Sequence, residues 1–295
     1  MPGIRTSAIT YRRGISNNTP NFFLFAQANY VIPQPTNRFR QNNIFSVSPS
    51  PTPPAPTCDY TFIGTGPLTQ TIVNAEIGTA QAICIQGYTS IDVIAFLNKS
   101  QITSVNIPTS VTSIGEAAFD LCSGLTSLII PNSVTYIAPR AIRRCGNLKS
   151  VTLPSNPLFT IINTGTFSGC SKLSSIIIPN SVITIDISAF QSCLSLSSVI
   201  IGTSVQNINA SAFQGCLSLS SVTIGTSVTN ILSQAFRGCT SLTSIVIPTS
   251  VTFIDISAFT SSGLTTVTIA NGQLGIPSPA SGVGFFGAIV TTQLP

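Results

Sequence analysis

Hydrophobic residues recur along most of the chain with a period of 23 residues. The unit that begins at Leu242 reads LTSIVIPTSVTFIDISAFTSSG, and the other units carry Ile or Leu at the same first position. These first positions are Ile102, Leu125, Leu148, Leu173, Leu196, Leu219, Leu242 and Leu264. One step is 25 residues long because of an insertion near residues 155–157, the last step is 22, and an imperfect earlier unit lies around residues 88–100. One unit cannot bury its own apolar side, whereas stacked units can, so the period predicts a solenoid.

Each unit is expected to begin with a short strand. In the unit at Leu242, alternation along the strand points Leu242, Ile245 and Ile247 inward, with Ser244 and Val246 facing outward. A proline follows in most units and ends the strand, since proline cannot donate to a continuing ladder.

A second short extended segment follows, in which Val251 and Ile254 are expected to point inward. Ala258 and Phe259 then begin a tight helical or turn segment, where the small alanine allows close backbone approach and the phenylalanine fills the interior. The prediction is a mainly β repeat solenoid with short strands, short helical turns and strand pairing between neighbouring coils.

The repeat resembles the BspA-type leucine-rich repeats, whose pattern joins C-x-x-L-x-x-I-x-I-P to S-V-x-x-I and A-F-x-x-C. Here the three parts are Cys170–Pro179, Ser181–Ile185 and Ala189–Cys193. The resemblance covers about residues 88–270 and implies a curved leucine-rich-repeat scaffold used for adhesion or protein contact. Such repeats occur in surface proteins of bacteria and protozoa and in large DNA viruses. The departures from the pattern are packing variations: Ile142 for Phe, Thr166 for Ala and Ser262 for Cys.

The repeat divides the chain into four segments. Residues 1–57 contain no repeat and are expected to form an extended arm, of which residues 46–57 are a Pro-rich linker. Residues 58–87 are expected to cap the solenoid of residues 88–270, and residues 271–295 to form a cap or tail at its other end.

The composition narrows the possible chemistry. Only 6% of the residues are charged, against about 25% in an ordinary domain, and there is no histidine. The absence of histidine excludes Ser-His-Asp and Cys-His nucleophile systems and zinc sites built on histidine. The sequence has no phosphate-binding G-x-x-x-x-G-K-[ST] motif and no run of about 18 apolar residues. We therefore expect no enzymatic activity, no cofactor or metal, no small-molecule substrate and no membrane span.

Six of the eight cysteines occupy one repeat position and are expected to stack as a buried, reduced ladder. They are Cys122, Cys145, Cys170, Cys193, Cys216 and Cys239. Parallel neighbours rarely offer the facing Cβ atoms that a disulfide needs, so the ladder should fill a small apolar slot. Whether Cys58 and Cys84 pair stays open. A reduced ladder and the lack of a recognisable export signal suggest assembly in a reducing compartment.

The outward strand positions form a Ser column and a second, partly apolar column. The second column contains Ile129, Thr152, Ile177, Ile200, Thr223 and Val246. An exposed apolar strip usually marks a contact surface, although β-propensity alone also places branched residues on strands. Both interpretations stay open at this point.

The N-terminal arm combines arginines with aromatic residues and contains no acidic residue. Its candidate partner-binding residues are Arg5, Arg12, Arg13, Phe22, Phe23, Phe25, Tyr30, Ile32, Arg38, Phe39 and Arg40. The arm carries the whole net charge of +5, because the rest of the chain has seven basic and seven acidic residues. Five spread arginines are a weak signal for nucleic acid, so a protein partner is favoured.

These features favour a structural component of a large assembly, with the arm tethering a rigid repeat block to neighbouring proteins. We interpret it first as a minor capsid or virion protein assembled in a host cytoplasm. The alternative is a cell-surface adhesion or protein-binding repeat protein, and a third possibility is an intracellular recognition module.

Overall fold

The structure, a computed structural model, describes residues 57–270 and 289–293 of the 295-residue chain. The chain divides into two units, Met1–Pro53 and Pro54–Pro295, and the first lies wholly outside the described residues. The arm residues from Arg5 to Arg40 lie in that first unit, so their expected role stays a prediction.

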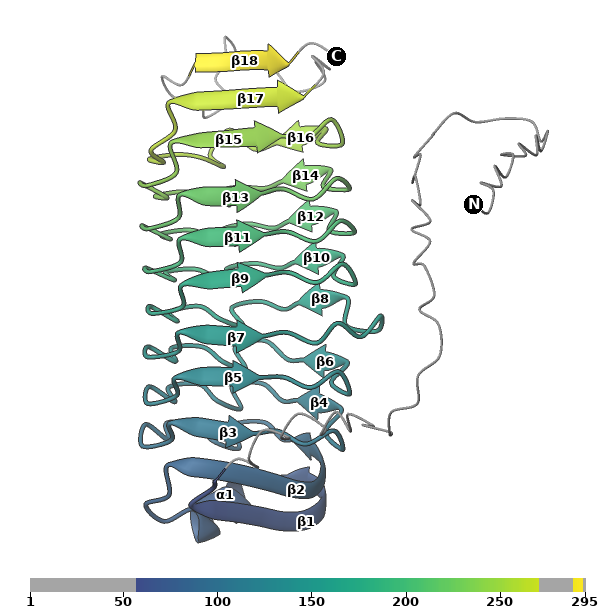
Figure 1. The fold of residues 1–295 in the computed structure, drawn as a ribbon, viewed down its shortest axis with the longest axis vertical. Helices are drawn as coiled ribbons and strands as arrows, with labels where there is room; N and C mark the ends of the chain where they lie inside the picture. Colours follow the sequence, from purple (N-terminus) through teal and green to yellow (C-terminus); the bar gives the residue numbers. More distant parts are fainter. Residues whose placement is uncertain (1–56, 271–288, 294–295) are drawn as a thin grey trace, which may run out of the picture. The chain divides into compact units, whose positions relative to one another are not determined.

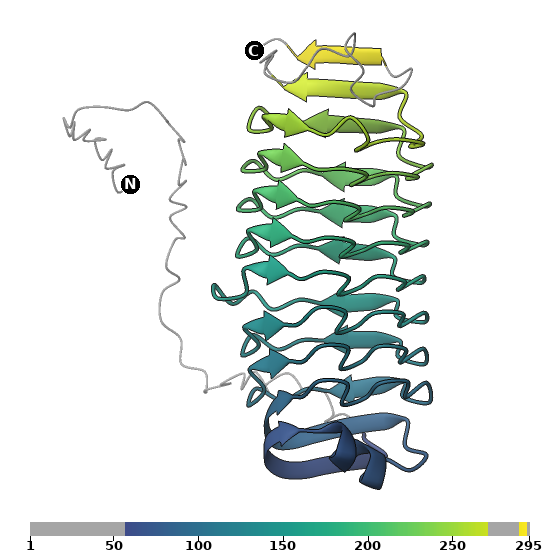
Figure 2. The ribbon, with the colours of Figure 1, turned by 180° about the vertical axis from the view of Figure 1, so that it is seen from behind.

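Residues 104–254 form a stack of coils, each of which contributes one strand to each of two faces (Figures 1 and 2). The strands of the first face, completed by β17, are β3 (Ser104–Asn106), β5 (Ser127–Ile129), β7 (Ser150–Thr152), β9 (Ser175–Ile177), β11 (Ser198–Ile200), β13 (Ser221–Thr223), β15 (Ser244–Ile247) and β17 (Thr266–Ala270). The strands of the second face are β4 (Ser113–Ile114), β6 (Tyr136–Ile137), β8 (Ile161–Ile162), β10 (Thr184–Ile185), β12 (Asn207–Ile208), β14 (Asn230–Ile231) and β16 (Phe253–Ile254). The expected two strands per coil are thus confirmed.

Longer elements precede the coils: β1 (Tyr60–Leu68), α1 (Gln70–Glu76) and β2 (Ala82–Ile91). β2 serves both faces, because Ile83 pairs with Val105 of β3 while Ile91 pairs with Ile114 of β4. β1 pairs in parallel with β2 and buries Phe62. At the other end, β18 (Ile289–Gln293) pairs in parallel with β17. That residues 58–87 act as a cap stays our proposal.

Equivalent strands of neighbouring coils pair in parallel and in register. Ser198 of β11, for example, lies opposite Ser175 of β9 on one side and Ser221 of β13 on the other. Among the described strands the ladder is interrupted at three places: between β7 and β9, between β13 and β15, and between β6 and β8. Since coils are otherwise superimposed, each residue of the repeat meets its own counterparts above and below.

The core lies inside the coils and consists of the positions that the repeat predicted. Leu242, Ile245 and Ile247 of the first strand are buried, as are Val251 and Ile254 of the second. The phenylalanines of consecutive coils stack with ring centroids 5.1–5.3 Å apart, in two series, Phe96–Phe119 and Phe167–Phe190–Phe213–Phe236–Phe259. Buried Ile142 occupies the position between the two series.

The segment around each phenylalanine is a turn, and α1 is the one helix within the described ranges. In most coils two residues of this turn have a left-handed backbone, for example Ser188 with a φ of 55° and Ser192 with a φ of 59°. Because residues with positive φ alternate with residues of ordinary negative φ, the amide groups of the turn point along the stack. Phe190 N, for example, donates to Ala212 O of the next coil at 2.8 Å. The turn therefore forms a third hydrogen-bonded ladder, which explains why this part need not be helical.

No helix within residues 57–270 and 289–293 is long and apolar enough to span a bilayer.

Candidate functional site

The outward side chains of the first-face strands align in columns that run from coil to coil. The parallel register places Ile177 opposite Ile200 and Ile200 opposite Thr223. The same register places Ile129 opposite Thr152. We call the set of six expected residues the aliphatic column: Ile129, Thr152, Ile177, Ile200, Thr223 and Val246.

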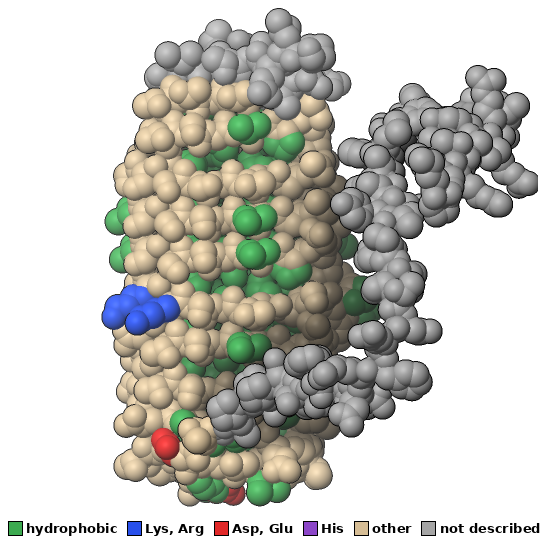
Figure 3. All heavy atoms as spheres, in the orientation of Figure 1, with side chains coloured by type: hydrophobic (Ala, Val, Ile, Leu, Met, Phe, Trp, Pro, Cys, Tyr) green, Lys and Arg blue, Asp and Glu red, His purple; other side chains and the backbone are tan. Residues whose placement is uncertain are grey.

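The aliphatic column is open to solvent. The solvent-exposed fraction of the residue is 69% for Ile129, 66% for Ile177, 55% for Val246 and 49% for Ile200. Figure 3 shows hydrophobic side chains that follow one another along this face. Thr152 and Thr223 are exposed as well. The structure thus brings all six residues to one surface, while their role in binding stays a prediction.

The face around the column is uncharged. None of the described first-face strands from β3 to β17 contains a charged residue, and serines form the neighbouring column. Figure 3 shows basic side chains at one edge of this face, away from the column. Lys149 and Lys172, both exposed, lie just before β7 and β9 in the chain. The surface is suited to apolar and hydrogen-bonding contacts, with positive charge available at a single edge.

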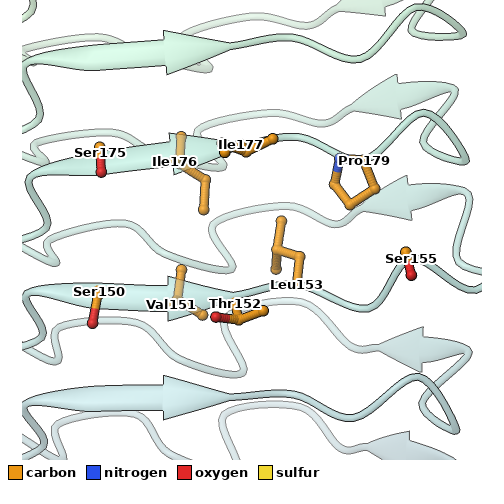
Figure 4. Close-up of a pocket in the computed structure, with 9 residues that line it drawn as sticks. All are labelled: Ser150, Val151, Thr152, Leu153, Ser155, Ser175, Ile176, Ile177 and Pro179. Carbon is orange, nitrogen blue, oxygen red and sulfur yellow. The ribbon is translucent and has the colours of Figure 1, made fainter. Parts of the chain in front are cut away.

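Pockets lined by described residues open on this face. The first, of about 390 Å³, lies between β7 and β9 and includes Val151, Leu153 and Ile176 among the residues shown in Figure 4. The second, of about 340 Å³, lies at β3 and β5, and the third, of about 230 Å³, lies between β13 and β15. The first and third coincide with interruptions of the strand ladder, because unpaired strands leave space between their side chains.

The six ladder cysteines are all buried and free, as the repeat predicted. The structure adds a polar role that the sequence analysis missed. Each Sγ donates to the main-chain oxygen of the core phenylalanine or Ile142 in the preceding coil, at 3.1–3.3 Å. Burial raises the pKa of Cys122 and of Cys239 to about 12, which keeps these thiols protonated and able to donate. The sequence carries one sign of this hydrogen bond: the last cysteine position of the repeat is occupied by Ser262, whose hydroxyl is also a hydrogen-bond donor.

Cys58 and Cys84, whose pairing the sequence left open, form a disulfide with a Cα–Cα distance of 5.7 Å. Cys84 lies on β2 directly opposite Asn106 of β3, and Asn106 lies opposite Ile129. The disulfide therefore lies at one end of the same outward column.

Three arginines form ion pairs with carboxylates of the preceding coil. Asp120 is only 3% exposed and accepts from Arg143 Nη2 at 2.7 Å, while Arg144 Nε lies 3.4 Å from its other oxygen. Arg140 pairs with Glu116 at 3.3 Å, with both side chains about half exposed. Glu116 thus binds one arginine of the next coil, and Asp120 binds two. Repeat spacing could have revealed this, since the partners lie 23 or 24 residues apart.

No group of three or more acidic, cysteine or histidine side chains within the described ranges is arranged to hold a metal ion.

Comparison with known proteins identifies the repeat. The model of the BspA type leucine rich repeat region matches residues 89–185 and 160–280, with six copies. A search of the curated proteins finds no match. Among solved structures, a leucine-rich repeat protein of T. pallidum is 25% identical, covers 62% of this chain and 83% of its own, and superimposes with a TM-score of 0.50. A leucine rich cell surface protein of Faecalibacterium prausnitzii A2-165 is 23% identical over 78% of this chain and 83% of its own, with a TM-score of 0.38.

These comparisons bear on the functional interpretation made from the sequence. They support a leucine-rich repeat protein, which agrees with the protein-binding part of the alternative interpretation. Nothing in them supports a capsid or virion role, which the sequence analysis had placed first.

Proposed function

Because the chain belongs to the BspA-type leucine-rich repeat family, we propose that it is a non-enzymatic protein-binding scaffold that acts at a cell surface. The proposed binding surface is the first face, centred on the aliphatic column. The observation that carries this proposal is the exposure of four aliphatic side chains, between 49% and 69%, in one aligned column. Aligned apolar side chains rimmed by polar ones are typical of protein-contact surfaces.

The second face supports this choice by contrast. Its outward residues include exposed Tyr136, Ile161 and Phe253, but three consecutive coils between them carry Thr184, Asn207 and Asn230. A hydrogen bond joins two of these polar side chains, from Asn230 Nδ2 to Asn207 Oδ1 at 2.8 Å. If β-propensity alone selected outward residues, both faces should look alike. From β5 to β15 the outward column of the first face contains only aliphatic residues and threonine, which favours a selected contact surface.

The disulfide supports the proposed location. Disulfides persist in oxidising compartments and are rare in the cytosol. The free ladder cysteines do not argue against this, because buried protonated thiols are inert whatever the compartment. The earlier interpretation took the ladder as a sign of a reducing compartment, and the inertness of buried thiols removes that argument.

Site-specific photo-cross-linking tests the binding surface. The photoreactive residue p-benzoylphenylalanine replaces Ile200 in the full chain, expressed in the organism that makes it, and cross-linked proteins are identified by mass spectrometry. The matched control places the same residue at Ile183, which is 39% exposed and lies outside the column. We expect a discrete cross-linked partner from position 200 alone. An excess of wild-type chain should suppress the cross-link, whereas an Ile129→Ser/Ile177→Ser/Ile200→Ser/Val246→Ser variant should not. Equal cross-linking from both positions would overturn the proposal.

Thiol labelling tests the location. A membrane-impermeant maleimide added to intact cells should label Cys58 and Cys84 only after a reductant breaks their disulfide. Free thiols at these two positions, protected inside intact cells, would contradict a surface location and leave the binding-face proposal to the cross-linking result.

A further inference from the structure

The stack departs from regular geometry at the coil that begins at Leu148. β5 pairs with β7, and β9 pairs with β11, but β7 and β9 do not pair. This coil is the one of 25 residues, and its additional residues near 155–157 are held on the outside. Ser155 N donates to Asn132 Oδ1 at 2.9 Å, and Asn156 Nδ2 donates to Asn132 O at 2.7 Å. The insertion thus displaces one coil relative to the next and opens the sheet at this point.

The opening partly uncovers Val151, whose counterpart in a regular coil is buried. Val199 in β11 is 1% exposed, whereas Val151, at the same repeat position in β7, is only partly buried. Figure 4 shows Leu153 and Ile176 in the space between β7 and β9, with Thr152 and Ile177 of the aliphatic column beside it. A pocket of about 390 Å³ lined in this way can take one apolar side chain from another molecule.

The same point carries unusual charge. Lys149 precedes β7, and its repeat position holds Thr or Ser in the other coils, namely Thr103, Thr126, Ser174, Ser197, Ser220, Thr243 and Thr265. Lys172 precedes β9, and the equivalent residues in coils on either side, Asn147 and Ser195, are uncharged. Within the described part of the chain neither lysine has an ion-pair partner, although Lys172 Nζ donates to Asn147 Oδ1 at 2.7 Å. Two exposed cations, neither of them in an ion pair within the described part of the chain, therefore lie beside the coil boundary at which β7 and β9 do not pair.

We propose that this boundary is the anchoring point for the protein partner: an apolar side chain of the partner enters the pocket between β7 and β9. A carboxylate close to it in the partner's sequence binds Lys149 and Lys172. The occupant is a protein segment that pairs an aliphatic or aromatic residue with an acidic one. This inference rests on the proposed function and specifies the partner's chemistry. Filling the pocket supplies most of the affinity, while the exposed lysines contribute orientation and a dependence on salt.

Peptide selection tests the anchor directly. A random dodecapeptide library is panned on the purified full chain, and dissociation constants of the retained peptides are measured by fluorescence polarisation. We expect the enriched sequences to place an acidic residue close to an aliphatic or aromatic one. Thr152→Trp, an exposed substitution beside the pocket, should weaken binding by at least about tenfold. Ile200→Trp, on the same face but in the continuous ladder, should have a smaller effect, and Ile183→Trp outside the face should have none.

Two double variants that each remove two positive charges test the contribution of the lysines to binding. Lys149→Gln/Lys172→Gln should weaken binding by about three- to tenfold at low salt and abolish most of its salt dependence. Lys99→Gln/Arg237→Gln removes the same charge elsewhere on the stack and should change neither. Circular dichroism establishes that each variant keeps the wild-type fold.

The outcomes separate the two proposals. If Ile200→Trp weakens binding as much as Thr152→Trp and the lysine variant binds normally, the face binds proteins but the anchor is wrong. If neither Trp substitution on the first face changes the dissociation constant of any retained peptide, the proposed anchoring point is wrong. The cross-linking experiment then decides the binding face on its own.

Discussion

Residues 115–179 and residues 181–231 follow the same repeat but differ in what holds their coils together. In the second stretch, phenylalanines stack without interruption and both strand ladders stay in register. In the first stretch, Ile142 interrupts the phenylalanine stack, and buried Thr166 replaces alanine and donates to Asn163 O at 2.7 Å. The strand ladders are interrupted there, and most of the ion pairing of the stack is found there as well.

The contrast shows how a repeat acquires specific features. In a regular coil each residue packs against the equivalent residues of the two adjacent coils. A substitution at one position therefore disturbs the packing on both sides. The buried ion pair lies beside the interruption of the phenylalanine stack at Ile142, and the pocket lies where β7 and β9 do not pair, so the restraint is relaxed at both places. The four predictions below test this difference, beginning with the feature that the two stretches share.

The largest expected effect comes from the cysteine ladder, which runs through both stretches. Burial raises the pKa of four ladder thiols above the ordinary value of 9.0, those of Cys122, Cys193, Cys216 and Cys239. A hydrogen bond with the thiol of Cys170, together with burial, raises the pKa of Cys145. Stability from these protonated thiols is therefore complete below pH 9 and is lost as pH rises toward 12, because the unfolded chain ionises first. Between pH 8 and pH 9.5 the free energy of unfolding should fall by about 1 kcal/mol for each of these five thiols. Urea unfolding at the two pH values measures it.

The control for this prediction is Cys193→Ala, which should reduce the pH dependence by one thiol's share while lowering stability at both pH values. A free energy of unfolding that is constant or rises over this pH range would contradict the assignment of the thiols as buried donors.

The next effect concerns the regular stretch. Phe213 is buried with its ring stacked between Phe190 and Phe236, so Phe213→Ala should lower the free energy of unfolding by about 3–5 kcal/mol. The matched control is Phe253→Ala, which removes a ring that is 47% exposed and should change stability by no more than about 0.5 kcal/mol. Denaturant unfolding followed by circular dichroism measures both. Equal effects of the two substitutions would show that the stack does not restrain the coils.

The third effect belongs to the irregular stretch. Asp120→Asn removes the charge of the buried carboxylate that binds Arg143 and Arg144. It should lower the free energy of unfolding by about 1–3 kcal/mol. The two arginine side chains are 30% and 49% exposed, so they regain some hydration and the cost stays below that of a fully buried pair. Glu116→Gln breaks an exposed pair and should cost less than about 0.5 kcal/mol. A stable Asp120→Asn variant would mean that the ion pair is dispensable where the stack is interrupted.

The smallest effect tests the left-handed turn position, which is glycine in some coils and serine in others. Gly215 has a φ of 72°, and a Cβ there would make only ordinary contact, 3.7 Å from Ser192 Oγ, so Gly215→Ala should lower the free energy of unfolding by about 1 kcal/mol through backbone strain alone. Ser192 lies at the same repeat position with a φ of 59°, so Ser192→Gly should raise the free energy of unfolding by up to about 1 kcal/mol. Thermal unfolding of both variants suffices, and shifts of the same sign would refute the argument.

Much of the fold could be predicted because each repeat residue meets its own counterpart in the next coil. The inward positions of the unit at Leu242, the pairing of strands and the stacking of Phe190 on Phe213 all follow from the 23-residue period. The aliphatic column was predictable for the same reason, since Ile177 and Ile200 are separated by one period. The helical alternative for the turn was wrong, because hydrogen bonds between coils, which a single unit does not contain, satisfy its amides.

The sequence by itself determined the repeat, the solenoid, the buried ladder of cysteines and the residues that face outward. These depend on local alternation and on spacing, and both are written in the order of residues. Only the tertiary structure decided that the thiols donate to carbonyl groups of the preceding coil, that Cys58 pairs with Cys84 and that Asp120 is buried against two arginines. It also decided where the sheet opens between β7 and β9. These features depend on how a coil is displaced against its neighbours, and a displacement of this kind has no signature in the alternation of hydrophobic and polar residues.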